Sequence, residues 1–161
     1  MKKKVLFVCS ANTCRSAVAA AILIEYGHRR YDVSSAGIYA RSGEPMHREC
    51  AEALEEIFGH GYSAYNHTST KLTYQHLMNA DVIVGVSEGY AAILRANFKE
   101  VADKVIAFET PISDISCLRG ESMVRAVKTI RDEVFKMFLE DEKHDLNKKN
   151  DGGERKSRRR T

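Results

Sequence analysis

The sequence predicts a single-domain α/β fold, an open parallel sheet of about four strands with helices on both faces. Two observations predict this fold. Short runs of β-branched and aromatic residues alternate with longer segments of helical spacing, which is typical of a parallel sheet. The chain also has 161 residues, of which 43% are hydrophobic, and this size fits one globular core.

Four short apolar runs are the predicted strands, at residues 4–8, 33–35, 81–86 and 104–108. Helices are expected between and after them, at residues 16–28, 46–58, 91–98 and 121–140, with a short one opening at Thr73. Gly59 is a predicted C-terminal cap. Residues 109–120 contain Pro111 and a Ser-Asp pair, so they are expected to form a loop.

The net charge of +3 is distributed unevenly along the chain. From residue 143 onward there are 8 Lys and Arg against 3 Asp and Glu, whereas the preceding residues carry 17 basic and 19 acidic side chains. The domain itself is therefore near neutral, which argues against a nucleic-acid partner. Residues 142–161 are predicted to be a basic, disordered tail, because they are charged and poor in apolar residues.

Several other classes of protein are disfavoured. The longest apolar stretch, residues 17–24, is far shorter than the ~20 residues of a membrane span, so no membrane contact is expected. The basic start is not followed by a cleavage pattern, which predicts a cytoplasmic protein with reduced thiols. No metal and no cofactor is expected, because zinc-site spacing is absent among the four cysteines Cys9, Cys14, Cys50 and Cys117.

Cys9 directly follows the first predicted strand and opens the sequence CSANTCRS, a Cys-x5-Arg-Ser arrangement. Ligands of open parallel sheets bind at this end of a strand. A loop of this length can turn its backbone N–H groups around a tetrahedral anion, and the next helix directs its positive end at the same point. Arg15 can hold two phosphoryl oxygens, and the same donors favour a nucleophilic Cys9 thiolate. The alternative is a packed thiol and an unrelated surface arginine.

The segment VCSANTCRS resembles the signature of the low-molecular-weight protein-tyrosine phosphatase family, whose usual form is VCxGNxCRSP. Three further blocks are similar to that family in order and spacing: SSAG at residues 34–37, NH at 66–67 and SD at 113–114. The resemblance covers residues 4–138. It implies a low-molecular-weight phosphatase-like domain at residues 1–141.

The resemblance also implies roles for individual residues. Cys9 would form a phosphocysteine intermediate, Arg15 would stabilise the transferred phosphoryl group, and Asp114 would serve as general acid and then general base. Cys14 would be able to form a protective disulfide with Cys9, or it would simply pack beneath the loop. For Cys50 and Cys117 no role is implied, and they are expected to be packing or surface thiols. The rest of the phosphate-binding loop would be Ser10, Ala11, Asn12, Thr13, Cys14 and Ser16, with Ser35 and His67 supporting it and Ser16 bonded to the thiolate.

Four positions depart from the family pattern, of which Ala17, in place of a proline at the helix start, is the mildest. Ala11 replaces a glycine, which would cost about 1 kcal/mol if that position needs a positive φ. Ile115 replaces a proline that is normally followed by an aromatic residue, so the wall for a phosphotyrosine ring is missing from this loop. Thr13 stands where tyrosine-directed members have a bulky aliphatic residue, and it resembles the protein-arginine phosphatase branch.

The expected function is hydrolysis of phosphotyrosine-type phosphomonoesters in phosphoprotein substrates, with protein-arginine phosphatase as the alternative. Inorganic phosphate or similar oxyanions are expected to bind as well. An arsenate reductase is less favoured, because no cysteine lies between Cys50 and Cys117 to relay a disulfide. A phosphocarrier would not need Arg15 together with Asp114. A non-catalytic phosphate-binding module is the remaining alternative.

Overall fold

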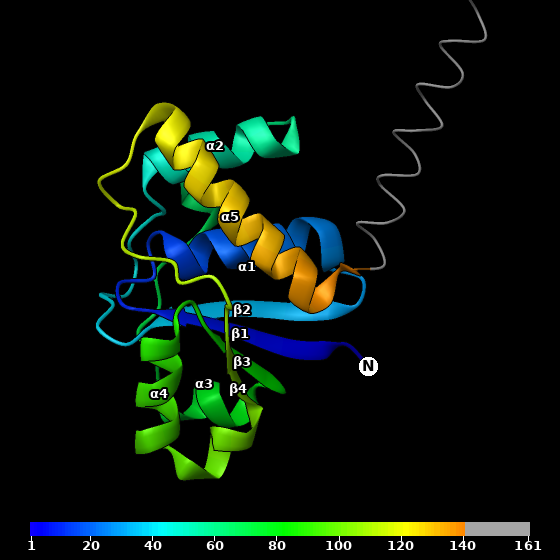
Figure 1. Ribbon diagram of the computed structural model, residues 1–161, viewed down its shortest axis with the longest axis vertical. Coiled ribbons are helices and arrows are strands. Elements are labelled where there is room, and N and C mark those ends of the chain that lie inside the picture. Colours follow the sequence, from blue (N-terminus) through cyan, green and yellow to red (C-terminus); the bar gives the residue numbers. More distant parts are fainter. Residues whose placement is uncertain (141–161) are drawn as a thin grey trace, which may run out of the picture.

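A four-stranded parallel sheet forms the centre of the molecule in the computed structural model, which describes residues 1–140 (Figure 1). The strand order is β2-β1-β3-β4, with bounds Tyr31–Gly37, Lys3–Cys9, Val82–Gly85 and Val105–Ala107. All three pairs of neighbours are parallel. The predicted fold class is confirmed. The predicted tail at residues 142–161 lies outside the described residues.

Helices cover both faces of this sheet. One face carries α1 (Arg15–Gly27), α2 (Arg48–Phe58) and α5 (Gly120–Phe138), and the opposite face carries α3 (Tyr74–Asn79) and α4 (Glu88–Asn97) (Figure 1). Two 3-10 helices that were not predicted, η1 (Ala64–Asn66) and η2 (Lys99–Lys104), lie in the connections. No helix among residues 1–140 has the length and apolar character needed to cross a membrane.

Strand β1 divides the interior into two cores, because successive side chains of a strand point to opposite faces. Val5, Phe7 and Cys9 belong to the larger core, under α1, α2 and α5. Leu6 and Val8 belong to the smaller core, on the side of α3 and α4. The first strand is thus buried on both faces, which explains its continuous apolar run.

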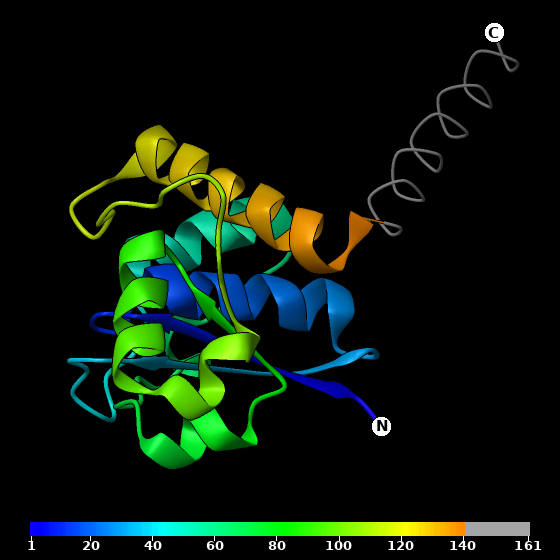
Figure 2. The same ribbon diagram turned by 60° about the horizontal axis from the view of Figure 1, so that its bottom comes forward.

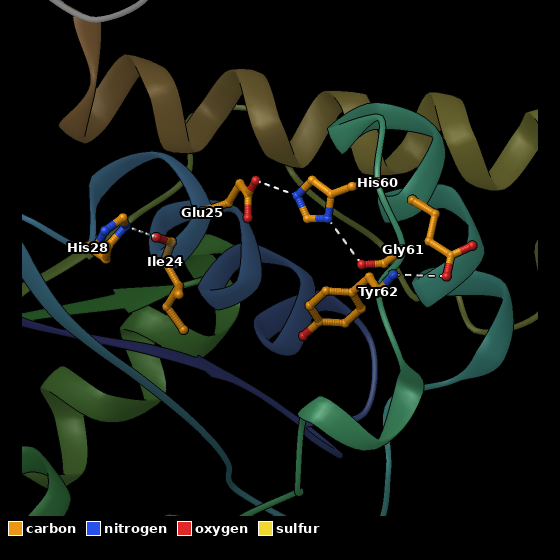
Figure 3. A network of polar contacts seen from close by, with 7 residues as sticks. Ile24, Glu25, His28, His60, Gly61 and Tyr62 are labelled. Carbon is orange, nitrogen blue, oxygen red and sulfur yellow. Dashed lines mark hydrogen bonds and ion pairs between the residues drawn. The ribbon is translucent and has the colours of Figure 1, made fainter.

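Helix α1 lies between the sheet and the pair α2 and α5 (Figure 1). Its residues from Ser16 to Leu23 are all buried, so the alanines of this segment allow close packing on several sides. At its C-terminal end, Glu25 is tied to the segment that follows α2: His60 Nε2 is 2.6 Å from Glu25 Oε1, and His60 Nδ1 is 3.1 Å from Gly61 O (Figure 3). The hydrogen bond to Glu25 raises the pKa of His60.

The carboxyl ends of the parallel strands meet at one edge of the sheet. The loop after β1, the loop after β2 and the connection between β4 and α5 gather there, on the left of Figure 1 and again in Figure 2. This edge brings residues near position 10 and near position 114 to one place. It is where ligands of open α/β sheets bind.

Candidate active site

Cys9 is the last residue of β1, and its thiol is free and buried. Its Sγ lies 2.8 Å from Ser16 Oγ, and the Asn12 backbone N–H donates to the same sulfur at 3.4 Å. Asn12 Nδ2 donates to Ser16 Oγ at 2.8 Å, which leaves the hydroxyl hydrogen of Ser16 available for Cys9. These contacts match the predicted arrangement and suit a negatively charged sulfur.

Asn12 is the centre of the hydrogen bonds that shape the loop from Cys9 to Ser16, called here the phosphate loop. It is fully buried, and its side chain donates to Ser16 and to Ser35 Oγ, the latter at 2.9 Å, while its Oδ1 accepts from Thr70 N at 2.9 Å. His67 Nε2 is 2.6 Å from Asn12 O. Because a carbonyl only accepts, that nitrogen carries a hydrogen; burial lowers the pKa of His67 and favours a neutral donor.

The left-handed backbone of the phosphate loop falls on Asn12, whose φ is 58°. Among residues 1–140 it is the one non-glycine residue with a positive φ, and asparagine tolerates this region better than most side chains. Ala11 does not adopt a positive φ, and it is exposed. The conformational cost considered for Ala11 is therefore not incurred.

The end of β2 closes the inner side of the phosphate loop. Ile38 N donates to Cys9 O at 2.9 Å and Tyr39 N donates to Ser10 O at 3.0 Å. At Gly37, an added Cβ would lie only 2.3 Å from Ser10 O, which no side chain can accommodate. This is the physical reason for glycine in the SSAG block.

A cavity of about 150 Å³ opens above the phosphate loop. The loop residues from Cys9 to Arg15 line it, together with His47, Asp114 and Ser116. The N-terminus of α1 begins at Arg15, so its positive end contributes to the field at the cavity. The structure thus brings the predicted nucleophile, arginine and general acid around one anion-sized space.

Arg15 is held at the border of this cavity by two partners. Its guanidinium donates to Ile112 O at 3.1 Å and to the Tyr90 hydroxyl at 3.0 Å, and it lies 5.3 Å from the centre of the Tyr90 ring. Ile112 belongs to the connection between β4 and α5, and Tyr90 belongs to α4. Helix α4 follows β3, which lies next to β1 in the sheet, and this places Tyr90 near Arg15. Tyr90 was not predicted from the sequence, because its contact with Arg15 depends on the adjacency of β1 and β3 in the folded sheet.

Asp114 lies in the loop between β4 and α5 and is exposed. Its Oδ1 accepts from Ser116 N at 3.0 Å. The pKa of Asp114 is lowered chiefly by this backbone hydrogen bond and next by a hydrogen bond from the Ser116 side chain. The positive charges of Arg15 and His47 lower it further. Ile115, which stands at the family's proline position, is buried and packs in the larger core. Ile115, Ser116 and Cys117 thus add no aromatic wall after Asp114.

The disulfide in the structure differs from the predicted one. Cys14 is bonded to Cys50 of α2, with 6.3 Å between their Cα atoms, whereas Cys9 is free. The predicted Cys9–Cys14 bond is therefore not the one observed, and Cys50 is more than a packing thiol. The cause is tertiary: His47 N, just before α2, donates to Thr13 O at 3.0 Å and brings the start of α2 to the phosphate loop. Cys117 is free and exposed, as expected.

Comparisons with known proteins agree with this geometry. Residues 4–117 match the family model described as Low molecular weight phosphotyrosine protein phosphatase. A protein-arginine-phosphatase of Bacillus subtilis is 31% identical over 108 residues, 65% of this chain and 69% of that protein. The low molecular weight protein-tyrosine-phosphatase Etp of Escherichia coli K12 is 31% identical over 107 residues, 65% of this chain and 68% of its own.

A solved structure points the same way. The YwlE arginine phosphatase from Geobacillus stearothermophilus superposes with a TM-score of 0.78 at 25% identity, covering 90% of this chain and 96% of that one. The family match extends over more than half of the chain and includes both the phosphate loop and Asp114. The chain therefore belongs to the low molecular weight phosphotyrosine protein phosphatase family.

Proposed function

We propose that this protein hydrolyses phosphorylated protein side chains in two steps through a phosphocysteine at Cys9. In the first step the Cys9 thiolate attacks phosphorus, an S–P bond forms, and the bond from phosphorus to the leaving group breaks. In the second step water attacks phosphorus, the S–P bond breaks, and phosphate leaves while Cys9 regains its negative charge. The observation that carries the proposal is the common cavity of Cys9, Arg15 and Asp114.

The phosphate loop is assigned the task of stabilising charge. Ser16 donates to the sulfur whenever it is a thiolate, in the ground state and again as the S–P bond breaks. Arg15 is held by Tyr90 and Ile112 through two of its five N–H donors, and the other three remain for the phosphoryl oxygens. Donors fixed before the substrate arrives need not reorganise during the reaction.

Asp114 is assigned proton transfer in both steps. It gives a proton to the leaving group as the first bond breaks, and it takes one from the attacking water afterwards. In the free protein its pKa is lowered, mainly by Ser116. A bound phosphoryl dianion next to the Cys9 thiolate opposes that effect, because nearby negative charge disfavours a second carboxylate charge.

For the substrate we propose phosphoarginine in proteins, ahead of phosphotyrosine. Thr13 lines the cavity that would receive the phosphorylated side chain, and it carries a hydroxyl group. A hydroxyl can accept from a guanidinium, whereas an aliphatic side chain cannot. The arginine phosphatases among the similar proteins support the same choice.

Phosphotyrosine remains the second candidate. The family description and the Escherichia coli relative both name tyrosine phosphatases. Against it stands the loop after Asp114, where Ile115 is buried in the core and an aromatic residue is lacking. A phosphotyrosine ring would have to find its apolar contacts elsewhere on the rim.

The first experiment tests the reaction class with p-nitrophenyl phosphate in the presence of EDTA. We expect turnover by the wild type and a loss of more than about 10³-fold in kcat for Cys9→Ser, the order seen when a nucleophile is removed. Cys117→Ser, a change at the exposed free cysteine, is the matched control and should retain wild-type kcat. Turnover that persists in Cys9→Ser would remove Cys9 from the mechanism.

The second experiment compares a phosphoarginine peptide with a phosphotyrosine peptide of the same flanking sequence. The wild type should have the higher kcat/KM on phosphoarginine. Thr13→Ile should reverse that order, and Thr13→Ser, which keeps the hydroxyl, should preserve it. A preference for phosphotyrosine in the wild type, unchanged in Thr13→Ile, would return the assignment to the tyrosine class.

A further inference from the structure

A second cavity adjoins the phosphate cavity across Arg15. It has a volume of about 340 Å³ and lies between the start of α4 and the loop that leads to Asp114. Arg15 lines both cavities, so the two spaces share one wall. Nothing in the proposed chemistry uses the second space, since Cys9 and Asp114 both line the first.

The walls of this second cavity are mainly apolar. Tyr90 and Ile93 come from α4, and Pro111 and Ile112 come from the opposite loop. Ile93 is 44% exposed, so part of its side chain is open to a bound partner at this cavity. Of the described residues that line the space, Arg15 alone is charged, and two of its donors are engaged.

The position of the cavity decides what can occupy it. A protein whose phosphorylated side chain enters the space above Cys9 must lay its adjacent backbone across the rim. Each residue of extended chain spans about 3.3–3.6 Å, so a neighbour within one or two positions has the reach to cross the shared wall formed by Arg15. Apart from Arg15, the lining offers that neighbour an uncharged and mainly apolar surface, with hydroxyl groups from Ser87, Ser113 and Tyr90.

We propose that this cavity is a substrate subsite that binds an apolar side chain within two positions of the phosphorylated residue, leucine being the model occupant. The subsite rests on the proposed phosphatase function and adds a sequence preference to it. Tyr90 has two tasks in this arrangement. Its hydroxyl accepts from Arg15, and its ring forms part of the apolar wall.

The test uses phosphopeptides that carry leucine or serine on either side of the phosphorylated residue, with p-nitrophenyl phosphate as a reference that has no flanking residue. On one side, leucine should raise the wild-type kcat/KM about tenfold over serine, chiefly through KM. Ile93→Glu should bring that leucine-to-serine ratio close to one. Ile24→Glu, the same change at an isoleucine of α1 that is 48% exposed, is the matched control and should keep the ratio near ten.

The outcomes separate the subsite from the reaction itself. Equal kcat/KM for leucine and serine on both sides, with good turnover of p-nitrophenyl phosphate, would overturn the subsite alone. A ratio that stays near ten in Ile93→Glu would also overturn it. Absence of any turnover of p-nitrophenyl phosphate would remove the phosphatase proposal and the subsite together. A wild-type dimer that Ile93→Glu converts to a monomer would assign the surface to a second copy of the chain and overturn the subsite.

Discussion

The phosphate loop and the loop that carries Asp114 are held in different ways. In the phosphate loop, Asn12 and Ser16 are fully buried. Hydrogen bonds join the loop to Ser35 of β2 and to Thr70, and the Cys14–Cys50 disulfide joins it to α2. The loop from Glu109 to Arg119 is anchored at its start, where the buried Glu133 carboxylate accepts from Glu109 N and Thr110 N. Asp114 itself is exposed and bonded only to Ser116, two residues away, among the hydrogen bonds described.

The difference teaches how the two halves of the reaction are supported. Charge stabilisation needs donors that are fixed before the substrate binds, and the phosphate loop has them. Proton transfer needs a carboxyl group that can gain and lose a proton, and such a group must remain open to solvent and substrate. The fixed hydrogen bonds are therefore gathered around Cys9, whereas the carboxyl group of Asp114 remains exposed and able to exchange protons.

The largest expected effect is at the general acid. Asp114→Asn should lower kcat for phenyl phosphate by about 10²–10⁴-fold, the range of general acid–base catalysis, because the amide cannot donate a proton to the leaving group. Glu109→Gln changes the carboxylate at the start of the same loop, which pairs with Lys136, and should leave kcat within about twofold. Steady-state kinetics checks both. A nearly normal rate in Asp114→Asn would place the acid elsewhere.

The second prediction concerns the disulfide of the phosphate loop. Reducing Cys14–Cys50, or making Cys50→Ser, should lower the free energy of unfolding by about 4 kcal/mol, because the bond closes a loop of 36 residues in the unfolded chain. Urea unfolding with and without a phosphine reductant measures this. In Cys50→Ser itself the reductant should have no further effect. An unchanged midpoint in the wild type would show that the bond does not stabilise the fold.

The third prediction separates the two contributions of Asn12. Asn12→Ala should destabilise the fold by about 2–4 kcal/mol, since Thr70 N loses its acceptor and alanine disfavours a φ of 58°. Asn12→Gly loses the same hydrogen bonds without the backbone strain, so it should be about 1 kcal/mol more stable than Asn12→Ala. Thermal unfolding of the two variants gives the difference. Equal stabilities would mean that the left-handed backbone relaxes at no cost.

The smallest expected effect is on the pH profile. The Ser116 side chain helps to lower the pKa of Asp114, so Ser116→Ala should raise that pKa. A higher pKa keeps the acid protonated to a higher pH. The descending limb of the profile of kcat/KM against pH, measured with phenyl phosphate, should therefore shift to higher pH by less than about one pH unit. Ser113→Ala, on the other side of Asp114, is the control. A limb that moves to lower pH in Ser116→Ala would contradict the assignment of Asp114 as acid.

The sequence was most informative where local pattern and position coincide. The buried apolar run of β1, which ends at Cys9, located the phosphate loop, and the short spacing from Cys9 to Arg15 and Ser16 lies within one local motif. The edge strand β2 is seven residues long, whereas only residues 33–35 were predicted, because Tyr31 and Asp32 lie on a partly exposed edge that lacks a continuous apolar run. Helix α4 begins at Glu88, three residues before its predicted start.

Contacts between distant segments were beyond the reach of the pattern. The sequence holds no signal that Cys50, 36 residues away, pairs with Cys14. Tyr90 reaches Arg15 only because β3 lies next to β1. Single-residue preferences also do not predict that the positive φ falls on Asn12 and not on Ala11. Its place is set by the hydrogen bonds that Asn12 makes with Ser35 and Thr70.

The close contact between Gly37 and Ser10 limits the ways in which this scaffold can evolve. A methyl group at residue 37 would overlap main-chain atoms, and main chain cannot rotate aside as a side chain can. The inner side of the phosphate loop is thus closed to variation at residue 37. Changes at Thr13, which lines the catalytic cavity, or at Ile93, which lines the adjoining one, leave this contact intact. New substrate preferences can therefore arise at these two positions without altering the backbone that holds Cys9.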